Sequence, residues 1–322
     1  MTIKKTLLTK FLTIIFLVSF IYNNKIYLLI FILHYKRRVP WYSDKPYDKT
    51  KSQEGSTDWM GKIKDSVDIR ELAIPGTHDS AASIFICPYY KLWWYNYQYQ
   101  CHMWSIEDQL NSGIRYLDLR PAGDGILYHG DGQTQYTFRH VFEIFKNFLI
   151  NHPTEGLFVR IQFQEKFYGD NIEECKKKVI YSVLDEFSEF LFKDNNVPTM
   201  GELRKKMFIF LDHLEYQNYL TWNKNDLIKL QDHYRLFGIR SSEIDKKKEL
   251  VKEFMLNEEK EKLIINHCSA IGRGVLTTLK FVAYAVNAVP FFADKFRGIF
   301  AFDFPGEGLV NHVINKNKIF YE

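Results

Sequence analysis

The residues best suited to acid–base chemistry lie in the heptad IPGTHDS at positions 74–80. Its histidine and aspartate, His78 and Asp79, occupy a Pro-Gly turn directly after the short apolar run 72–74. An imidazole exchanges protons near neutral pH, and a nearby carboxylate favours its charged form. A single histidine in a turn is more often a solvated or capping residue, so this heptad needs support from the rest of the chain.

Two more polar residues end apolar runs in the same manner. Arg120 closes the strand-like run 114–119, and His129 follows the run 126–128. Two histidines and an arginine provide a base, an acid and a cation. These groups suit an intramolecular phosphoryl transfer, in which a hydroxyl of the substrate attacks its own phosphodiester and a second alcohol leaves.

The order of these motifs resembles a known family. The GTHDS turn, the run QLNSGIRYLDLR at 109–120 and the His-Gly pair at 129–130 resemble the X domain of phosphatidylinositol-specific phospholipase C. The nearest forms are the bacterial type and its small metal-independent eukaryotic relatives. Weaker matches continue to the C-terminus, at 231–234, 266, 269–270 and 302–305.

This resemblance implies a role for each residue. His78 would take the proton of the inositol 2-hydroxyl, and Asp303 would hold its working tautomer. Asp79 would orient His129, which would protonate the departing diacylglycerol oxygen. Arg120 would pair with the non-bridging phosphate oxygens. The expected products are diacylglycerol and inositol cyclic phosphate.

The same resemblance implies no metal and no cofactor. Calcium-dependent members of the family carry a carboxylate where this chain has Arg120, and a guanidinium there would repel a divalent cation. Asp118 lies on the same face of its strand as Arg120. It would either ligate a metal or, the preferred interpretation, brace Arg120.

Recognition of the lipid head group is less well defined. By resemblance, Asp232 would bind inositol hydroxyls and Tyr234 would stack on the sugar ring, with Glu165 as a third contact. Bacterial members carry lysines before this glutamate, whereas this chain has QFQ at 162–164. Asp212-His213 stands where an arginine contact is expected. Phosphatidylinositol, a glycosylated inositol lipid and another phospholipid therefore all remain open.

The expected partner is a phospholipid at a membrane surface. Trp93 and Trp94, within the aromatic run 89–95, suit the membrane interface because such rings combine apolar and polar ends. The apolar stretch 275–292 is either a second lip or a buried barrel helix. A net charge of +4 without a basic stripe gives no sign of nucleic-acid binding, and no obligatory protein partner is evident.

These residues require elements that bring them together. Alternating strands and helices imply a parallel sheet, and the resemblance implies a distorted TIM (β/α)8 barrel in a single domain. Its chemistry would lie at the carboxyl ends of the strands. Strands are expected at Glu71–Ile74, Ile114–Leu119, Ile126–Tyr128, Leu157–Phe163, Met207–Leu211, Leu236–Ile239, Leu263–Asn266 and Gly298–Phe302, and helices at Phe138–Ile150, Ile172–Phe192 and Glu243–Leu256.

The N-terminus is expected to be a separate unit. Three lysines precede the apolar run 11–22, which has the length of a secretory signal core, and a second apolar run follows at 26–33. We expect a signal or membrane-anchor segment at 1–40, a linker at 41–64 and the catalytic barrel at 65–322. Entry into the secretory pathway is favoured, with anchored and secreted forms both open.

The cysteines and the lysine run have ordinary structural explanations. Cys87 and Cys101 would form either a disulfide or two free thiols, and the lysines at 246–248 are read as a solvated helix face or loop. The alternatives to a metal-independent phospholipase C are a catalytically inactive lipid-binding module and a metal-dependent phosphodiesterase. The retained histidines disfavour the first, and Arg120 disfavours the second.

Overall fold

The computed structural model describes residues 39–48, 56–83, 99–165, 171–217, 219–222, 225–237, 241–272 and 278–322. The chain divides into compact units at Met1–Val39 and Pro40–Glu322, and the second is described below. Nearly all of the expected N-terminal segment lies outside the described residues, as do Cys87, Trp93 and Trp94. In the described part of the chain, no helix is both long and apolar enough to span a membrane.

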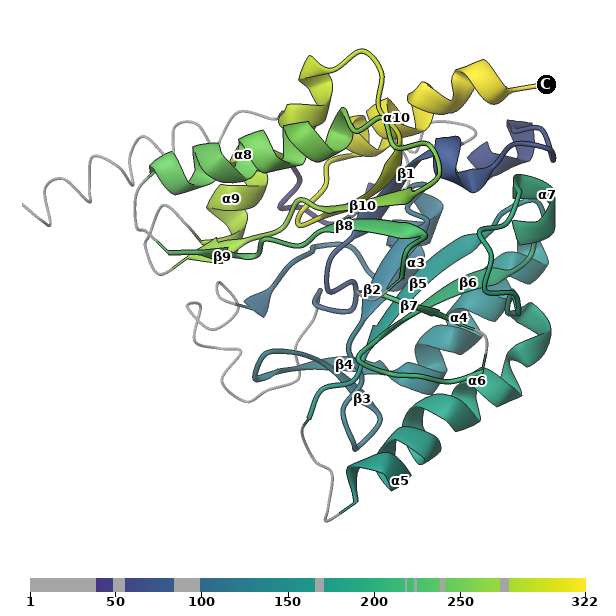
Figure 1. Cartoon of the computed structure of the whole chain (residues 1–322). Helices are drawn as coiled ribbons and strands as arrows, with labels where there is room; N and C mark the ends of the chain where they lie inside the picture. The colour runs from purple at the N-terminus through teal and green to yellow at the C-terminus, as the bar shows by residue number, and fades with distance from the viewer. Residues whose placement is uncertain are drawn as a thin grey trace, which may run out of the picture. The chain divides into compact units, whose positions relative to one another are not determined.

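One parallel sheet forms the centre of this unit (Figure 1). It curls into a barrel that is open between its edge strands β7 and β8, which confirms the distorted TIM-type barrel. In spatial order its strands are β7 (Leu220–Thr221), β6 (Met207–Asp212), β5 (Leu157–Gln162), β2 (Tyr116–Leu119), β1 (Ala73–Thr77), β12 (Gly298–Phe302), β10 (Leu263–His267) and β8 (Ile228–Gln231).

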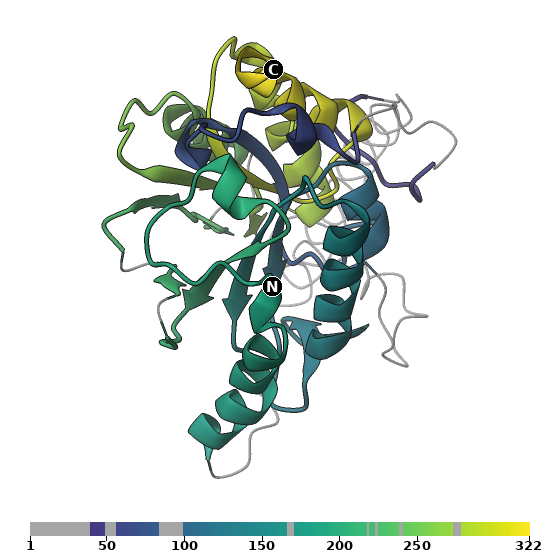
Figure 2. The same ribbon diagram turned by 90° about the vertical axis from the view of Figure 1, so that its right-hand side faces the viewer.

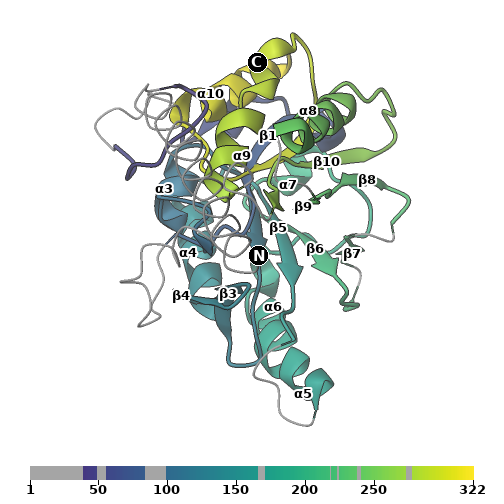
Figure 3. The same ribbon diagram turned by 90° about the vertical axis from the view of Figure 1, so that its left-hand side faces the viewer.

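Helices cover the outside of the sheet in two groups. Helices α4, α5 and α6 lie on one side, and α8, α9 and α10 lie on the other (Figures 2 and 3). The helices are α3 (Ile106–Asn111), α4 (Phe138–Asn151), α5 (Ile172–Lys176), α6 (Ser182–Glu186), α7 (Met200–Leu203), α8 (Ser241–Met255), α9 (Leu279–Val286) and α10 (Glu307–Asn315). A π-helical turn, Lys177–Tyr181, joins α5 to α6.

The strands alternate between two apolar environments. Along β5, Leu157, Val159 and Ile161 pack with the apolar face of α4. Phe158, which points the other way, belongs to the cluster that fills the barrel. The inward positions that follow it, at the carboxyl end of the strand, lie above this apolar layer. Polar residues at these positions therefore face the mouth of the barrel.

One expected barrel strand is wrong, and a second is described only at its start. The run at 126–128 forms β3 (Ile126–His129), which pairs antiparallel with β4 (Gly132–Thr137) in a hairpin outside the main sheet. In the run at 236–239, residues 238 and 239 lie outside the described residues, and its start belongs to β9 (Arg235–Leu236), which pairs with β11 (Ile271–Gly272) outside the main sheet. The barrel is completed by β7 and β8, which were not predicted. They contain only two and four residues, and such short strands give little sequence signal.

Both ends of the expected linker belong to the folded unit. Tyr42 forms a β-bridge with Pro305, and Trp59, Met60 and Ile63 are fully buried or nearly so. The described parts of 41–64 are thus packed segments of the barrel unit. The described part of the apolar stretch 275–292 is a barrel helix, since the inner residues of α9 are buried against β12.

A buried ion pair fixes the described part of 41–64 that contains Gly61. Arg115 Nη2 lies 2.6 Å from Glu155 Oε2, with both side chains fully buried. The guanidinium also donates to the carbonyls of Leu110 and Ile114, at 2.9 and 2.8 Å. Glu155 Oε1 accepts the backbone N–H of Gly61 at 3.1 Å. One carboxylate therefore joins β2 to the segment before β1.

Replacing Glu155 with alanine should lower the free energy of unfolding by about 3–5 kcal/mol, because Arg115 would keep a buried charge without a counter-ion. Urea denaturation followed by tryptophan fluorescence measures this change. The matched control is Glu186→Ala, which breaks the exposed pair with Arg139 and should change stability little. Equal losses in the two variants would contradict the assigned role of Glu155.

Candidate active site

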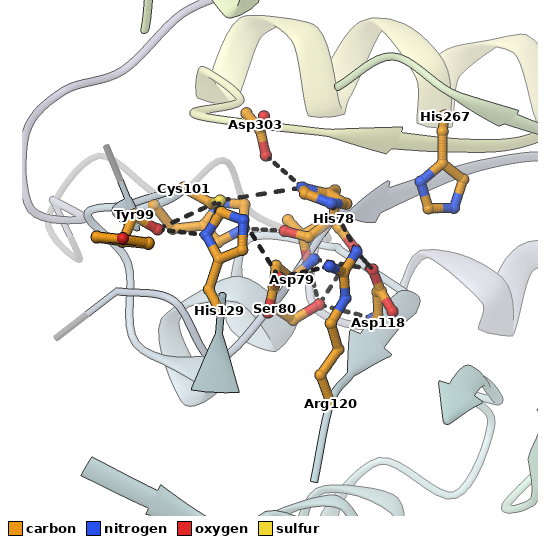
Figure 4. A network of polar contacts seen from close by, with 12 residues as sticks. His78, Asp79, Ser80, Tyr99, Cys101, Asp118, Arg120, His129, His267 and Asp303 are labelled. Carbon is orange, nitrogen blue, oxygen red and sulfur yellow. Dashed lines mark hydrogen bonds and ion pairs between the residues drawn. The ribbon is translucent and has the colours of Figure 1, made fainter. Parts of the chain in front are cut away.

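Three neighbouring strands bring the first candidate residues together. His78 directly follows β1, and β1 lies between β2 and β12. Thr77 is in register with Leu117 on one side and Phe302 on the other. Arg120 and Asp303 follow those two strands, so all three side chains meet at the carboxyl edge of the sheet (Figure 4).

The neighbours of His78 define its tautomer. Its Nδ1 lies 3.0 Å from Asp303 Oδ1, and Arg120 Nη2 lies 2.7 Å from its Nε2. Because arginine can only donate, Nε2 must accept and Nδ1 carries the proton. Burial, reinforced by the Arg120 charge, lowers the pKa of His78 to about 3, and burial raises the pKa of Asp303 to about 6. The imidazole is therefore neutral, with a lone pair at Nε2.

Two carboxylates hold Arg120. Its Nη1 lies 3.1 Å from Asp79 Oδ2, and its Nη2 lies 3.0 Å from Asp118 Oδ2. Burial alone would lower the pKa of Arg120, but these two carboxylates raise it above its ordinary value. For Asp118 the directions are reversed. Burial alone would raise its pKa, but Arg120 and Arg160 hold that pKa well below its usual range. Asp118 therefore braces Arg120, as the sequence favoured.

His129 reaches the site from the β3–β4 hairpin. Its Nδ1 lies 2.6 Å from the carbonyl oxygen of Tyr99, and its Nε2 lies 3.6 Å from Asp79 Oδ2. Its ring centroid is 5.7 Å from that of His78, with the rings nearly perpendicular. The Tyr99 carbonyl can accept only from a protonated Nδ1, so Nε2 is the nitrogen that exchanges protons.

The turn that carries these residues is tightly constrained. Asp79 has a φ of 47°, which is unfavourable for a residue other than glycine, and its N–H donates to Asp118 Oδ2 at 3.1 Å. Gly76 allows close packing, since a Cβ there would lie 2.6 Å from the Cβ of Tyr116. Thr77 and Ser80 are buried and joined through their hydroxyls at 2.7 Å.

These side chains open into a cavity of about 420 Å³. It is lined mainly by residues from the strand ends and following loops, including His78, Arg120, His129, Arg160, Gln162, Gln164, Asp232, Tyr234 and Ser269. Arg160 was not predicted. It pairs with Asp118 at 3.1 Å and with Asp212 at 2.5 Å. A charged residue in the apolar run 157–163 is the signal that would have identified it.

The predicted head-group residues differ in position. Asp232 lines the cavity, and its Oδ1 lies 3.7 Å from His267 Nδ1. Burial alone would raise the pKa of Asp232, but His267 and Arg160 lower it. Tyr234 stands at the rim, 47% exposed, with the Arg235 guanidinium 5.3 Å from its ring centre. Glu165 is exposed and is not among the lining residues, whereas Gln164 is.

A third histidine faces the site and was also missed. His267 ends β10, is fully buried, and lies on the other side of His78 from His129 (Figure 4). Its ring centroid is 5.8 Å from that of His78, and its Nε2 lies 3.3 Å from the Tyr116 hydroxyl. Burial lowers the pKa of His267 to about 3, so its ring is neutral.

The lysine run at 246–248 is not simply a solvated face. Lys247 is fully buried. Its Nζ donates to Gln231 Oε1 at 3.0 Å and to the carbonyls of His233 and His267 at 2.8 and 2.6 Å. Burial lowers the pKa of Lys247 to about 8. Its three bonds tie β8 to β10 and fix the loop that carries Asp232.

The cysteines that the structure describes are free thiols. Cys101 and Cys268 are buried and Cys175 is half-buried. Cys101 Sγ lies 3.4 Å from His129 Nδ1 and 3.9 Å from His78 Nδ1. The disulfide alternative for Cys101 is therefore absent from this structure, and a thiol stands between the two histidines instead.

Comparisons with known proteins agree on one kind of relative. No protein-family model matches the chain. It is 26% identical over 288 residues to a 1-phosphatidylinositol phosphodiesterase of Listeria monocytogenes, covering 81% of this chain and 84% of the relative. A Staphylococcus aureus enzyme of the same name is 22% identical over 307 residues, covering 81% and 94%. The solved phosphatidylinositol-specific phospholipase C of L. monocytogenes matches the fold with a TM-score of 0.67, at 23% identity, over 82% of this chain and 99% of that one.

Lys247→Met should lower the free energy of unfolding by about 2–4 kcal/mol, since three hydrogen bonds that join β8 to β10 would be lost and each acceptor would lose one donor. Lys246→Met and Lys248→Met are matched controls within the same run, with side chains 71% and 39% exposed. Both should unfold at nearly the wild-type urea concentration. If all three variants behave alike, Lys247 does not hold the strand ends together.

Proposed function

We propose that this protein, a chain of the bacterial type of phosphatidylinositol-specific phospholipase C, cleaves the phosphodiester of an inositol phospholipid without a metal ion. The products would be diacylglycerol and inositol cyclic phosphate. The observation that carries this proposal is the arrangement around His78. An ionisable carboxyl lies at Nδ1, a guanidinium lies at Nε2, and a second histidine lies 5.7 Å away between ring centroids.

In the proposed reaction, His78 Nε2 takes the proton of the inositol 2-hydroxyl while that oxygen bonds to phosphorus. Asp303 stabilises the resulting imidazolium. The bond from phosphorus to the glycerol oxygen breaks, and His129 Nε2 gives that oxygen a proton. Arg120 stabilises the charge on the non-bridging oxygens, and Asp79 lies close enough to both Arg120 and His129 to orient them.

The cavity supports an inositol-sized head group next to this centre. Asp232 offers acceptors for ring hydroxyls, and Tyr234 stands at the rim as a stacking surface. Arg160 supplies a cation that the sequence analysis had not found in this pocket. We assign no binding role to Glu165, because its exposed side chain is not among the lining residues.

Association with the membrane surface rests on two sequence features. The aromatic run 89–95 and the apolar run 11–22 support a secreted or anchored enzyme.

The decisive experiment is turnover of phosphatidylinositol in mixed micelles with excess EGTA, using the full chain and resolving the water-soluble products. We expect inositol cyclic phosphate. His78→Ala and His129→Ala should each lower kcat by roughly 10²–10⁴-fold, because each removes one proton-transfer group. His140→Ala, on the exposed face of α4, is the control.

Undiminished turnover in His78→Ala would refute the proposed mechanism. Absence of product from the wild-type chain, with and without calcium, would favour another head group or an inactive lipid-binding module.

Asp303→Asn should lower kcat by roughly 10²–10⁴-fold with little change in KM. The amide has no charge with which to stabilise the imidazolium or enforce the tautomer of His78. Asp194→Asn removes an exposed carboxylate and should have no effect. Steady-state kinetics with the same micelles separate the two parameters. A change confined to KM would show that Asp303 binds substrate rather than assisting His78.

A further inference from the structure

One buried group beside the two histidines has no part in the proposed reaction. Cys101 is fully buried, and its thiol contacts the Nδ1 nitrogens of His129 and His78 at 3.4 and 3.9 Å. Asp303 completes this corner, since its Oδ1 lies 3.0 Å from His78 Nδ1. Figure 4 shows the thiol next to the His129 ring and joined to His78 by a dashed line, on the side of His78 away from Arg120.

The spacing of the atoms from His78, Cys101 and Asp303 is compatible with a metal site. Zinc bonds of about 2.3 Å to sulfur and about 2.0–2.2 Å to nitrogen or oxygen, arranged tetrahedrally, separate ligand atoms by about 3.4–3.6 Å. The two sulfur–nitrogen distances here are 3.4 and 3.9 Å, and the nitrogen–oxygen distance is 3.0 Å. The candidate ligand atoms of His78, Cys101 and Asp303 all lie within 4.8 Å of one another. His129 Nδ1 lies 3.4 Å from the sulfur but does not belong to this group, so the three protein ligands would leave the fourth tetrahedral position to solvent.

A second observation points to a ligand. Asp303 is 1% exposed, and its Oδ2 has no hydrogen-bond partner of normal geometry among the described residues, although the Cys101 thiol interacts with this carboxylate. A buried carboxylate oxygen without a donor is costly, and a cation would satisfy it. A thiolate and a carboxylate together also cancel the charge of a divalent ion, so the occupied corner would be neutral.

We propose that a soft divalent cation such as Zn²⁺ binds between Cys101 Sγ, the Asp303 carboxylate and His78 Nδ1, and that it inhibits the enzyme. The thiol gives up its proton to solvent when sulfur bonds the metal. The Nδ1 proton of His78 moves to Nε2, which then has no lone pair for the substrate hydroxyl.

The ligand set determines which ions would act. Sulfur and imidazole ligands favour zinc and similar soft or borderline ions, whereas calcium and magnesium prefer oxygen. Arg120 lies on the opposite side of the His78 ring, at Nε2, so it does not occupy this corner. The inhibitory effect rests on the proposed function, but binding itself does not.

The first test measures binding without activity. Co²⁺ titrated into the full chain should produce a thiolate-to-metal charge-transfer band and the strong visible bands of tetrahedral cobalt. Zn²⁺ should remove both. Cys101→Ser should abolish the charge-transfer band, and Cys175→Ser, which alters a half-buried thiol on α5, should retain it. A band that survives in Cys101→Ser, or no band in the wild type, would overturn the proposal.

The second test measures turnover at buffered free Zn²⁺, with each variant normalised to its own rate in chelator. Loss of a single hydrogen-bond partner of a metal ligand already lowers metal affinity about 10–100-fold. Loss of the thiolate ligand itself should therefore raise the inhibition constant for Zn²⁺ by roughly 100-fold or more. Equal Ca²⁺ should not inhibit. The same inhibition constant in Cys101→Ser would overturn the site. If no substrate is turned over at all, the proposed function fails, and the cobalt spectra still decide the site.

Discussion

The buried carboxylate of Asp118 is the interaction on which the site depends. Its side chain is fully buried, and Oδ2 accepts from the N–H of Asp79, from Arg120 and from Arg160, at 3.1, 3.0 and 3.1 Å. Through these bonds one carboxylate holds the strained turn after β1 and the cations of β2 and β5. A lone buried charge would be very costly, whereas one shared by two guanidiniums and an amide is well satisfied. Removing it would leave both arginines without their common partner.

The barrel makes this arrangement possible by separating apolar and polar layers. Inward side chains low in the strands, such as Phe158 and Ile299, belong to one apolar cluster. The inward positions nearest the strand ends are polar, as with Arg160 after Phe158 and Asp303 after Ile299 and Ala301, and neighbouring strands place them side by side. Asp118, for example, is in register with Arg160. The fold therefore concentrates charge at one end of a core that is otherwise dry.

Much of this site could be predicted from the sequence, because motif residues carry their own local signal. His78, Arg120 and Asp303 each stand directly after a strand, and their strands proved to be neighbours. Position after an apolar run is not sufficient, however. His129 follows such a run, yet it reaches the site from a hairpin whose antiparallel pairing the run does not reveal.

Arg160 was missed although its charge interrupts an apolar run, and Lys247 was missed because no local pattern sets it apart from its neighbours. Arg160 lies within an apolar run, and the partners that neutralise it, Asp118 and Asp212, come from other strands. Lys247 stands between two exposed lysines, and its acceptors come from β8, β10 and the loop after β8. A charged side chain can be buried only where such distant partners meet, and that meeting is a property of the tertiary fold.

The two sides of the His78 ring have opposite character, and this contrast links catalysis to the proposed inhibition. Nε2 faces a guanidinium, which only donates, while Nδ1 faces a carboxylate, which in its ionised form only accepts. These two neighbours impose the same tautomer, the one that leaves a lone pair for the substrate hydroxyl. Asp303 accepts the proton on Nδ1, whereas a cation bound there would need the lone pair of that nitrogen. The ring would then need its proton at Nε2, where Arg120 already donates, so metal binding and base catalysis require incompatible states of one imidazole.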